Sequence, residues 1–249
     1  MSGSARLDVP VVPDKSPDRI AGMFDAIAPR YDLLNRLLSV GIDRYWRRRA
    51  IDALALTGRE VLVDVATGTA DVALEARAPG RGAATAARIV GVDFAGAMLA
   101  LGLGKVRAAG QEPYVVLVQG DAMRLPVEGR SADAVTIAFG IRNVQTAAVA
   151  CAEMARVLKP GGRLAILEFG IPRVPGISRL YQWYFRAVLP RVGRLISGHT
   201  GAYSYLPASV GTFTPPAEFA RVLEQAGFTA VRTDPLTCGI VYLYTARRA

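Results

Sequence analysis

Short apolar runs alternate with helix-forming segments along most of this chain. Each run is long enough for one strand, and apolar residues recur at helical spacing between the runs. This alternation predicts an α/β fold in which helices cover both faces of a parallel sheet. Two later runs, separated by Pro235, predict a hairpin-like edge of the sheet. The strands are expected at 60–66, 88–93, 114–119, 132–139, 163–169, 228–234 and 240–246, and the central helices from 71, at 96–109 and at 147–158.

The N-terminal part has a different pattern. Residues 1–19 contain three prolines and few large apolar side chains, so a flexible tail is expected there. Apolar residues follow at helical spacing over 20–56. Pro29 is predicted to break this segment into two helices, because proline lacks the backbone N–H and clashes with the preceding turn.

Two predicted strands end in acidic residues, Asp64 and Asp93. The carboxyl ends of parallel strands form the ligand site of such folds, and Asp93 can accept hydrogen bonds from ribose hydroxyls. A dinucleotide requires the G-x-G-x-x-G turn, whereas this turn has Gly68 and then Ala70. The pattern favours S-adenosylmethionine, a cation without phosphate, and the alternative is a strand–turn–helix without a ligand. As a non-glycine residue, Ala70 is expected to keep a negative φ.

Composition narrows the protein class. The chain is 51% hydrophobic and 20% charged, with a net charge of +9 and a pI of about 10.0. Nucleic acid or an anionic membrane surface would suit this charge, but the arginines are scattered and no nucleic-acid motif is present. We expect a cytoplasmic protein without a signal peptide, a membrane span or a metal site. Cys151 and Cys238 are expected to be reduced and buried.

Several motifs together resemble a known family. The segment Leu158-Lys159-Pro160-Gly161-Gly162 resembles class I S-adenosylmethionine-dependent methyltransferases. With three further stretches, it resembles the menaquinone/ubiquinone-biosynthesis C-methyltransferases from about residue 23 to 245. The sequence departs from their pattern at Asp43, where histidine is usual. The three further stretches are Gly120-Asp121-Ala122, Phe139-Gly140-Ile141-Arg142-Asn143-Val144, and the segment 31–39 that begins Tyr31-Asp32.

This resemblance implies a fold and a reaction. The fold is a Rossmann-like class I methyltransferase with a mostly parallel seven-stranded sheet, helices on both faces and an N-terminal helical extension. A single domain at 20–249 would comprise a helical cap at 20–56 and a core at 57–249, with a lid insertion at 171–215. The reaction is C-methylation of a prenylated hydroquinone, with demethylmenaquinol preferred. A ubiquinol precursor, another lipophilic acceptor and a basic nucleic-acid-binding module remain as alternatives.

The chemistry of this reaction suggests roles for particular residues. Arg142 follows the fourth predicted strand and stays charged, so it would stabilise the phenolate of the acceptor. Asn143 would bind a ring oxygen, and His199 is a candidate base because an imidazole titrates near neutral pH. A loop-stabilising Arg142 and an exposed His199 are the alternatives. The resemblance implies that the cofactor would be bound by Asp64, Gly68, Thr69, Asp93, Asp121 and Ala122.

A segment rich in aromatic residues and arginine, 177–196, suggests how the acceptor's tail is received. It is expected to cover the site and to contact an anionic membrane surface at headgroup level. The alternative is a helix that faces the core, with its arginine side chains extending to water. We therefore expect peripheral attachment to the inner face of the membrane, without nucleic-acid binding. The sequence allows a homodimer but does not establish the oligomeric state.

Overall fold

A mostly parallel seven-stranded sheet forms the centre of the molecule, as predicted. The computed structural model describes residues 14–82, 84–172, 174, 176, 179, 183 and 201–249. The strand order is β3-β2-β1-β4-β5-β7-β6. Strand β7 alone runs in the direction opposite to the other strands, because it pairs antiparallel with both β5 and β6. The strands are β1 (Val61–Val65), β2 (Arg88–Asp93), β3 (Val115–Gln119), β4 (Ala132–Ala138), β5 (Leu158–Phe169), β6 (Phe228–Leu236) and β7 (Val241–Arg248).

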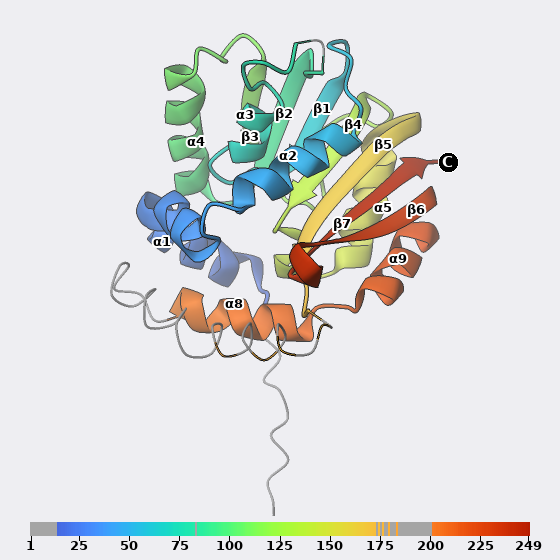
Figure 1. Cartoon of the computed structure of the whole chain (residues 1–249). Coiled ribbons are helices and arrows are strands. Elements are labelled where there is room, and N and C mark those ends of the chain that lie inside the picture. The colour runs from blue at the N-terminus through green and yellow to red at the C-terminus, as the bar shows by residue number, and fades with distance from the viewer. Residues whose placement is uncertain are drawn as a thin grey trace, which may run out of the picture.

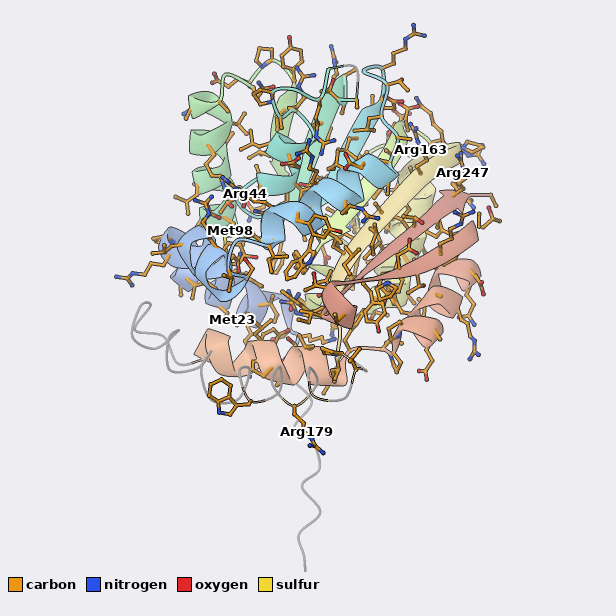
Figure 2. All side chains as sticks on the ribbon, viewed as in Figure 1. Met23, Arg44, Met98, Arg163, Arg179 and Arg247 are labelled. Atoms are coloured by element: carbon orange, nitrogen blue, oxygen red, sulfur yellow. The ribbon has the colours of Figure 1, made fainter. Side chains whose placement is uncertain are left out.

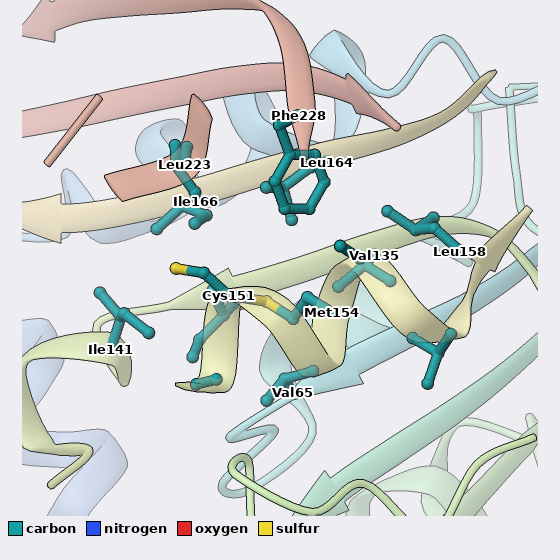
Figure 3. Packing of buried hydrophobic residues seen from close by; sticks show 14 of the residues in the cluster. Val65, Val135, Ile141, Cys151, Met154, Leu158, Leu164, Ile166, Leu223 and Phe228 are labelled. Carbon is teal, nitrogen blue, oxygen red and sulfur yellow. The ribbon is translucent and has the colours of Figure 1, made fainter. Parts of the chain in front are cut away.

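Helices cover both faces of this sheet (Figure 1). Helices α2 (Asp43–Ala53), α3 (Asp71–Glu75) and α4 (Gly96–Ala108) cover one face, whereas α5 (Ala147–Val157) and α9 (Pro216–Gln225) cover the other. The strands supply both cores because successive side chains point to opposite faces. Leu62 packs under α2, whereas Val63 and Val65 pack towards α5. Figure 3 shows Cys151 and Met154 of α5 among these buried side chains.

The N-terminal segment folds differently from the prediction at Pro29. Helix α1 (Pro17–Leu38) runs through this proline without ending, and it begins within the predicted tail. The first helix ends instead at a turn in which Val40 and Gly41 both have positive φ. The Gly41 N–H donates to the Arg36 carbonyl at 2.9 Å, a bond typical of helix C-termini. Pro29 therefore costs α1 one hydrogen bond but does not set its boundary.

The C-terminal hairpin of β6 and β7 was predicted correctly, and the structure differs from the prediction at Pro235 and at the start of β5. Pro235 lies inside β6 rather than between the strands, which is permitted because β6 is an edge strand. β5 begins at Leu158, so the Leu-Lys-Pro-Gly-Gly segment belongs to this strand and is accommodated by a shift in register. Cys151 is buried as expected, but Cys238 is exposed, because it occupies a tight turn at φ 58°.

Two helices lie beyond the carboxyl ends of the parallel strands. Figure 1 shows α1 and α8 (Gly201–Thr212) at this edge of the sheet. A small apolar cluster of α1, the start of α4 and α8 joins them, with Ile27, Met98 and Val210 buried in it. Most of the expected lid at 171–215 lies outside the described residues, including nearly all of 177–196. The edge where ligands bind in this fold class is thus covered by helices from both ends of the chain.

Charged side chains surround the molecule rather than collecting on one face. In Figure 2, Arg163 and Arg247 lie at one end of the sheet, and Arg179 lies at the opposite end beside α8. Arg44 projects from a third position, on α2. This distribution agrees with the scatter of arginines along the sequence. None of the helices in the described part is both long and apolar enough to cross a bilayer.

Candidate functional site

A pocket of about 880 Å³ opens at the carboxyl edge of the sheet, beneath α1. This volume includes space that is open to solvent. The lining residues are largely apolar. They come from α1 and the segment before it, from the start of α4, from the ends of β2 and β4, and from the loops after β1, β2, β3 and β4. They are Lys15, Ile20, Phe24, Tyr31, Ala66, Gly68, Val92, Asp93, Phe94, Met98, Gly120, Asp121, Ala122, Met123, Ala138, Phe139, Gly140, Asn143, Val144 and Gln145.

The turn after β1 is closed by its own hydrogen bonds. The Gly68 N–H donates to Asp93 Oδ2 at 2.8 Å, and the Ala70 N–H donates to the Thr67 carbonyl at 2.9 Å. These amides are thus already bonded, whereas a dinucleotide fold leaves them free for pyrophosphate. Ala70 has φ +64°, so the expectation of a negative φ was wrong. The turn keeps its left-handed geometry without the second glycine, because surrounding structure holds this fully buried residue.

Two acids lie buried at this turn. Asp93 lines the pocket, and its Oδ1 also accepts from the Ala95 N–H at 2.9 Å. Burial raises the pKa of the Asp93 carboxyl, although the donors to it act in the opposite direction. Asp64 is 1% exposed and does not line the pocket. Burial raises the pKa of its carboxyl to about 7, against the lowering effect of the 2.6 Å hydrogen bond from Thr67.

The loop after β3 forms the other end of the cofactor region. Asp121 and Ala122 both line the pocket, as predicted. Asp121 Oδ1 accepts from the Met123 N–H at 2.8 Å, so this carboxylate caps the turn and still presents its second oxygen. Gly120 is required by close packing, because a Cβ at this position would lie 2.6 Å from Pro126. A turn-capping role and a ligand-binding role for Asp121 are therefore compatible.

Arg142 is held behind the pocket by Glu168. Arg142 lies in the short helix η1 (Ile141–Asn143). The Arg142 guanidinium donates through Nη1 to Glu168 Oε1 at 2.8 Å and also to the Phe139 carbonyl. Arg142 is 6% exposed, Glu168 is completely buried, and neither lines the pocket. Asn143 does line it, and its Oδ1 has no hydrogen-bond partner among the described residues. Of the predicted catalytic residues, Asn143 therefore faces the pocket, Arg142 supports it, and His199 lies outside the described residues.

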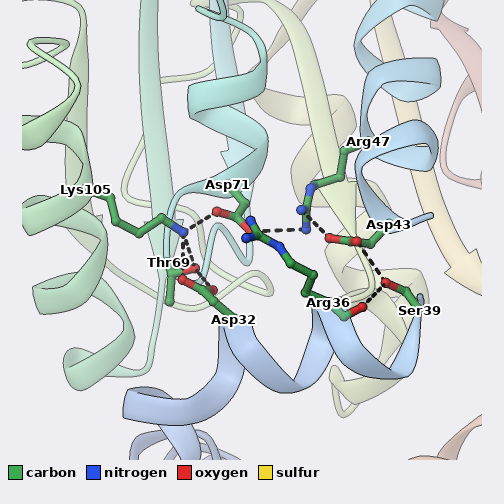
Figure 4. A network of polar contacts seen from close by, with 8 residues as sticks. All are labelled: Asp32, Arg36, Ser39, Asp43, Arg47, Thr69, Asp71 and Lys105. Atoms are coloured by element: carbon green, nitrogen blue, oxygen red, sulfur yellow. Dashed lines mark hydrogen bonds and ion pairs between the residues drawn. The ribbon is translucent and has the colours of Figure 1, made fainter. Parts of the chain in front are cut away.

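A polar network ties the N-terminal helices to the cofactor turn (Figure 4). The Thr69 hydroxyl donates to Asp32 of α1 at 2.7 Å, and Lys105 of α4 donates to both residues. Asp71 pairs with Lys105 and with Arg47, which also pairs with Asp43. Thr69 is 2% exposed and does not line the pocket, so the structure places it in this network. Asp43 likewise belongs to the network rather than to the pocket.

Sequence reasoning missed the part of the pocket that comes from α1. Lys15, Phe24 and Tyr31 all line it, although only Tyr31 lay in a recognised motif. Burial raises the pKa of the Tyr31 hydroxyl. No local pattern marks these residues, because their place depends on how α1 packs across the sheet edge. The two acids after β1 and β2, however, did mark the edge itself.

The residues present fit S-adenosylmethionine. Asp93 and Asp121 flank an apolar region that includes Phe94, Met98 and Ala122, which suits a ribose beside an adenine ring. Among the lining side chains of the described part, these acids outnumber the single basic residue, Lys15, so the pocket is unsuited to a pyrophosphate.

Solved structures show that this fold is shared widely. The [4+2]-cyclase SpnF has a TM-score of 0.70 at 18% identity, covering 95% of this chain and 98% of SpnF. A Thermotoga maritima protein described as an S-adenosylmethionine-dependent methyltransferase, a possible histamine N-methyltransferase, has a TM-score of 0.63 at 16% identity. That match covers 92% of this chain and all of the other. At such identities the likeness establishes the fold alone, and one fold supports different reactions.

Sequence comparison is more specific. The ubiquinone/menaquinone biosynthesis C-methyltransferase UbiE of Syntrophotalea carbinolica is 50% identical over 227 residues, 91% of this chain and 93% of that protein. The demethylmenaquinone methyltransferase of Thermus thermophilus is 47% identical over 228 residues, 91% of this chain and 100% of that protein. The model of the ubiE/COQ5 methyltransferase family matches residues 13–248. The chain therefore belongs to the ubiE/COQ5 methyltransferase family.

Proposed function

We propose that this protein uses S-adenosylmethionine to methylate a ring carbon of a prenylated hydroquinone, with demethylmenaquinol as the preferred acceptor. Family membership supports the reaction class, and the names of the Thermus thermophilus and Deinococcus radiodurans relatives support this acceptor. The observation that best supports the proposal is that one pocket contains Asp93, Asp121 and an apolar region that ends at Asn143. A ubiquinol precursor is the second candidate, since the name of the Syntrophotalea carbinolica relative includes both pathways.

Each end of the pocket has a distinct binding task. When bound, S-adenosylmethionine supplies an electrophilic methyl group on a sulfonium. Asp93 would accept hydrogen bonds from the ribose, and Asp121 with the Ala122 N–H would bind the adenine. Asp64 and Gly68 would adjoin the methionine part. Thr69 would contact that part too if its hydroxyl exchanged the 2.7 Å bond to Asp32 for the ligand.

The acceptor end must favour an ionised ring hydroxyl, since a neutral phenol makes the ring carbon a poor nucleophile. A phenol with a pKa near 10 is mostly protonated at pH 7. Asn143 lines this end of the pocket and would hydrogen-bond a ring oxygen. Arg142 remains charged and would add to the positive potential from behind the pocket, with Glu168 as its partner. His199 is a further candidate for the base.

The prenyl tail requires an apolar route and a membrane source. We propose that the 171–215 segment receives the tail, and that basic charge attaches the protein to the inner, anionic face of the membrane. Described parts of this segment expose large apolar groups beside Arg179: Ile171 is 47%, Val174 45% and Trp183 59% exposed. Binding to anionic vesicles at low salt and release at high salt would support this attachment. Equal binding to neutral vesicles would reject its electrostatic part.

Turnover of two acceptors tests the proposal. The purified protein should methylate a short-tailed demethylmenaquinol faster than the matching demethylated benzoquinol, as measured by methyl transfer from labelled S-adenosylmethionine. Arg142→Ala should reduce turnover by about 10²–10³ while keeping cofactor affinity. Arg142→Lys should recover part of this loss, and His199→Gln should have a mild effect. Methylation of neither hydroquinone would refute the function, and inactivity of His199→Gln alone would make His199 the base.

A further inference from the structure

Lys15 is a cation at the acceptor end of the pocket that has no ion-pair partner among the described residues. Only Ser16 separates it from α1, and it is the one basic side chain among the lining residues of the described part. No ion pair within 4.0 Å and no side-chain hydrogen bond is formed by its ammonium group with any described residue. An ammonium group beside a largely apolar wall has lost water without gaining an anion. Such a group binds an anion more strongly than an exposed lysine does.

The neighbouring charges leave this cation unbalanced. Arg142 and Glu168 both act electrostatically on Lys15, but they neutralise each other through their 2.8 Å ion pair. Burial is the main reason that the pKa of Lys15 is lowered, with Arg142 acting in the same direction and Glu168 opposing it. Lys15, Arg142 and Glu168 together have a net charge of +1. Because the Arg142 guanidinium does not reach the lining, the ammonium of Lys15 presents this charge to a ligand.

We propose that Lys15 is a catalytic residue that binds the ionised ring oxygen of the acceptor. This inference rests on the proposed C-methylation. The O–H bond of the ring hydroxyl breaks, its proton goes to solvent, and the electron pair stays on the oxygen. The ammonium of Lys15 donates a hydrogen bond to that oxygen and lowers the cost of the charge. The ring can then share the electron pair with the carbon that is methylated.

The pH dependence of turnover tests this role in the full-length protein. Lys15→Met should lower kcat/KM by about 10²–10³ at pH 7, because one charged contact to the reacting oxygen is lost. The deficit should shrink as the pH approaches 10, where the acceptor ionises without help. Lys15→Arg should recover most of the loss. Arg19→Met is the matched control, because Arg19 carries the same charge on the same segment but is exposed and absent from the lining.

Other ionisable groups must be separated from this effect. Besides Glu168 and Arg142, these groups are Tyr31, Asp93 and Asp121 in the lining and Tyr205 on α8, whose pKa also responds to that pair. Lys15→Met leaves all of them in place, so a change confined to the acidic limb of the kcat/KM profile reports Lys15. A loss of equal size at pH 7 and near pH 10 would overturn the proposal, because it would indicate a structural role.

A binding measurement separates this inference from the proposed function. The ionisation of 1-naphthol can be followed by absorbance in the presence of S-adenosylhomocysteine. Wild type and Arg19→Met should lower the pKa of bound 1-naphthol, and Lys15→Met should not. Unchanged binding of S-adenosylhomocysteine would show that the variant is folded. If wild type methylates no hydroquinone, the proposed function fails; if it does and Lys15→Met shifts neither pKa nor pH profile, only the inference fails.

Discussion

Replacing Glu168 by glutamine should destabilise the fold by about 3–5 kcal/mol, the usual cost of leaving a buried charge without its partner. Glu168 is completely buried and accepts three hydrogen bonds. Its Oε1 accepts from Arg142 Nη1 and from the Phe169 N–H, both at 2.8 Å, and its Oε2 accepts from the Arg142 N–H at 3.1 Å. Glutamine would direct an NH₂ group at one of these donors and leave a guanidinium that cannot lose its charge.

Removal of Arg142, the other partner, should lower the free energy of unfolding by less than removal of Glu168. Arg142→Met leaves a carboxylate that can take up a proton, and Lys15 remains nearby as a partial counter-charge. Urea denaturation at pH 7, followed by circular dichroism, should therefore rank Glu168→Gln as less stable than Arg142→Met. The double variant should be more stable than Glu168→Gln alone, because the unpaired guanidinium has gone.

An exposed ion pair provides the control for this series. Lys159 is 45% exposed and pairs with Asp133 at 2.6 Å, so Lys159→Met should cost no more than about 1 kcal/mol. The reasoning is refuted if Glu168→Gln stays within 1 kcal/mol of wild type, or if the two single losses add fully in the double variant. Either result would mean that Arg142 is solvated or paired elsewhere when Glu168 is absent.

Three other features of the site lead to predictions. Folding raises the pKa of the Asp64 carboxyl to about 7, so the folded state retains a proton that the unfolded chain loses near pH 4. The free energy of unfolding should therefore fall by up to about 4 kcal/mol as the pH rises from about 4 to about 7. Asp64→Asn should remove this fall in thermal denaturation at pH 5 and 8; an unchanged slope would contradict it. Gly104 is an exposed residue of α4, so Gly104→Ala should stabilise the fold by about 0.5–1 kcal/mol. Gly102→Ala should destabilise it, because the new Cβ would lie 2.9 Å from Leu117, and the opposite ranking of melting temperatures would refute this packing. Asp93→Asn should weaken S-adenosylhomocysteine binding by about 1–3 kcal/mol in calorimetry, and unchanged affinity would exclude Asp93 from the site.

The sheet could be predicted because its signals are local. The apolar runs of β1, β2 and β4 have the right length, and their ends carry the residues expected at a ligand-binding edge. Strand β2 was placed correctly at both ends, since Asp93 marks its last residue. The motifs after β3 and β4 also located Asp121 and Asn143 at the pocket, because each lies in the segment that leaves the carboxyl end of a strand.

Features that depend on distant packing could not be predicted in this way. The partner of Arg142 is Glu168, which lies near the end of β5, and only the parallel pairing of β4 with β5 brings them together. Pro29 was expected to end a helix, but the packing of α1 on α4 and α8 maintains it. Lys15 lay within the predicted tail, and its position in the pocket depends on where α1 begins.

A hydrogen bond joins the N-terminal helical cap to the turn after β1. Thr69 belongs to the turn that follows β1, yet its hydroxyl bonds to Asp32 on α1. The same helix places Phe24 and Tyr31 at the pocket, and Lys15 lies two residues before its start. A ligand that engaged the Thr69 hydroxyl would compete with Asp32 and so act on the position of α1. In that case cofactor binding and the placement of the acceptor end would be coupled through this helix.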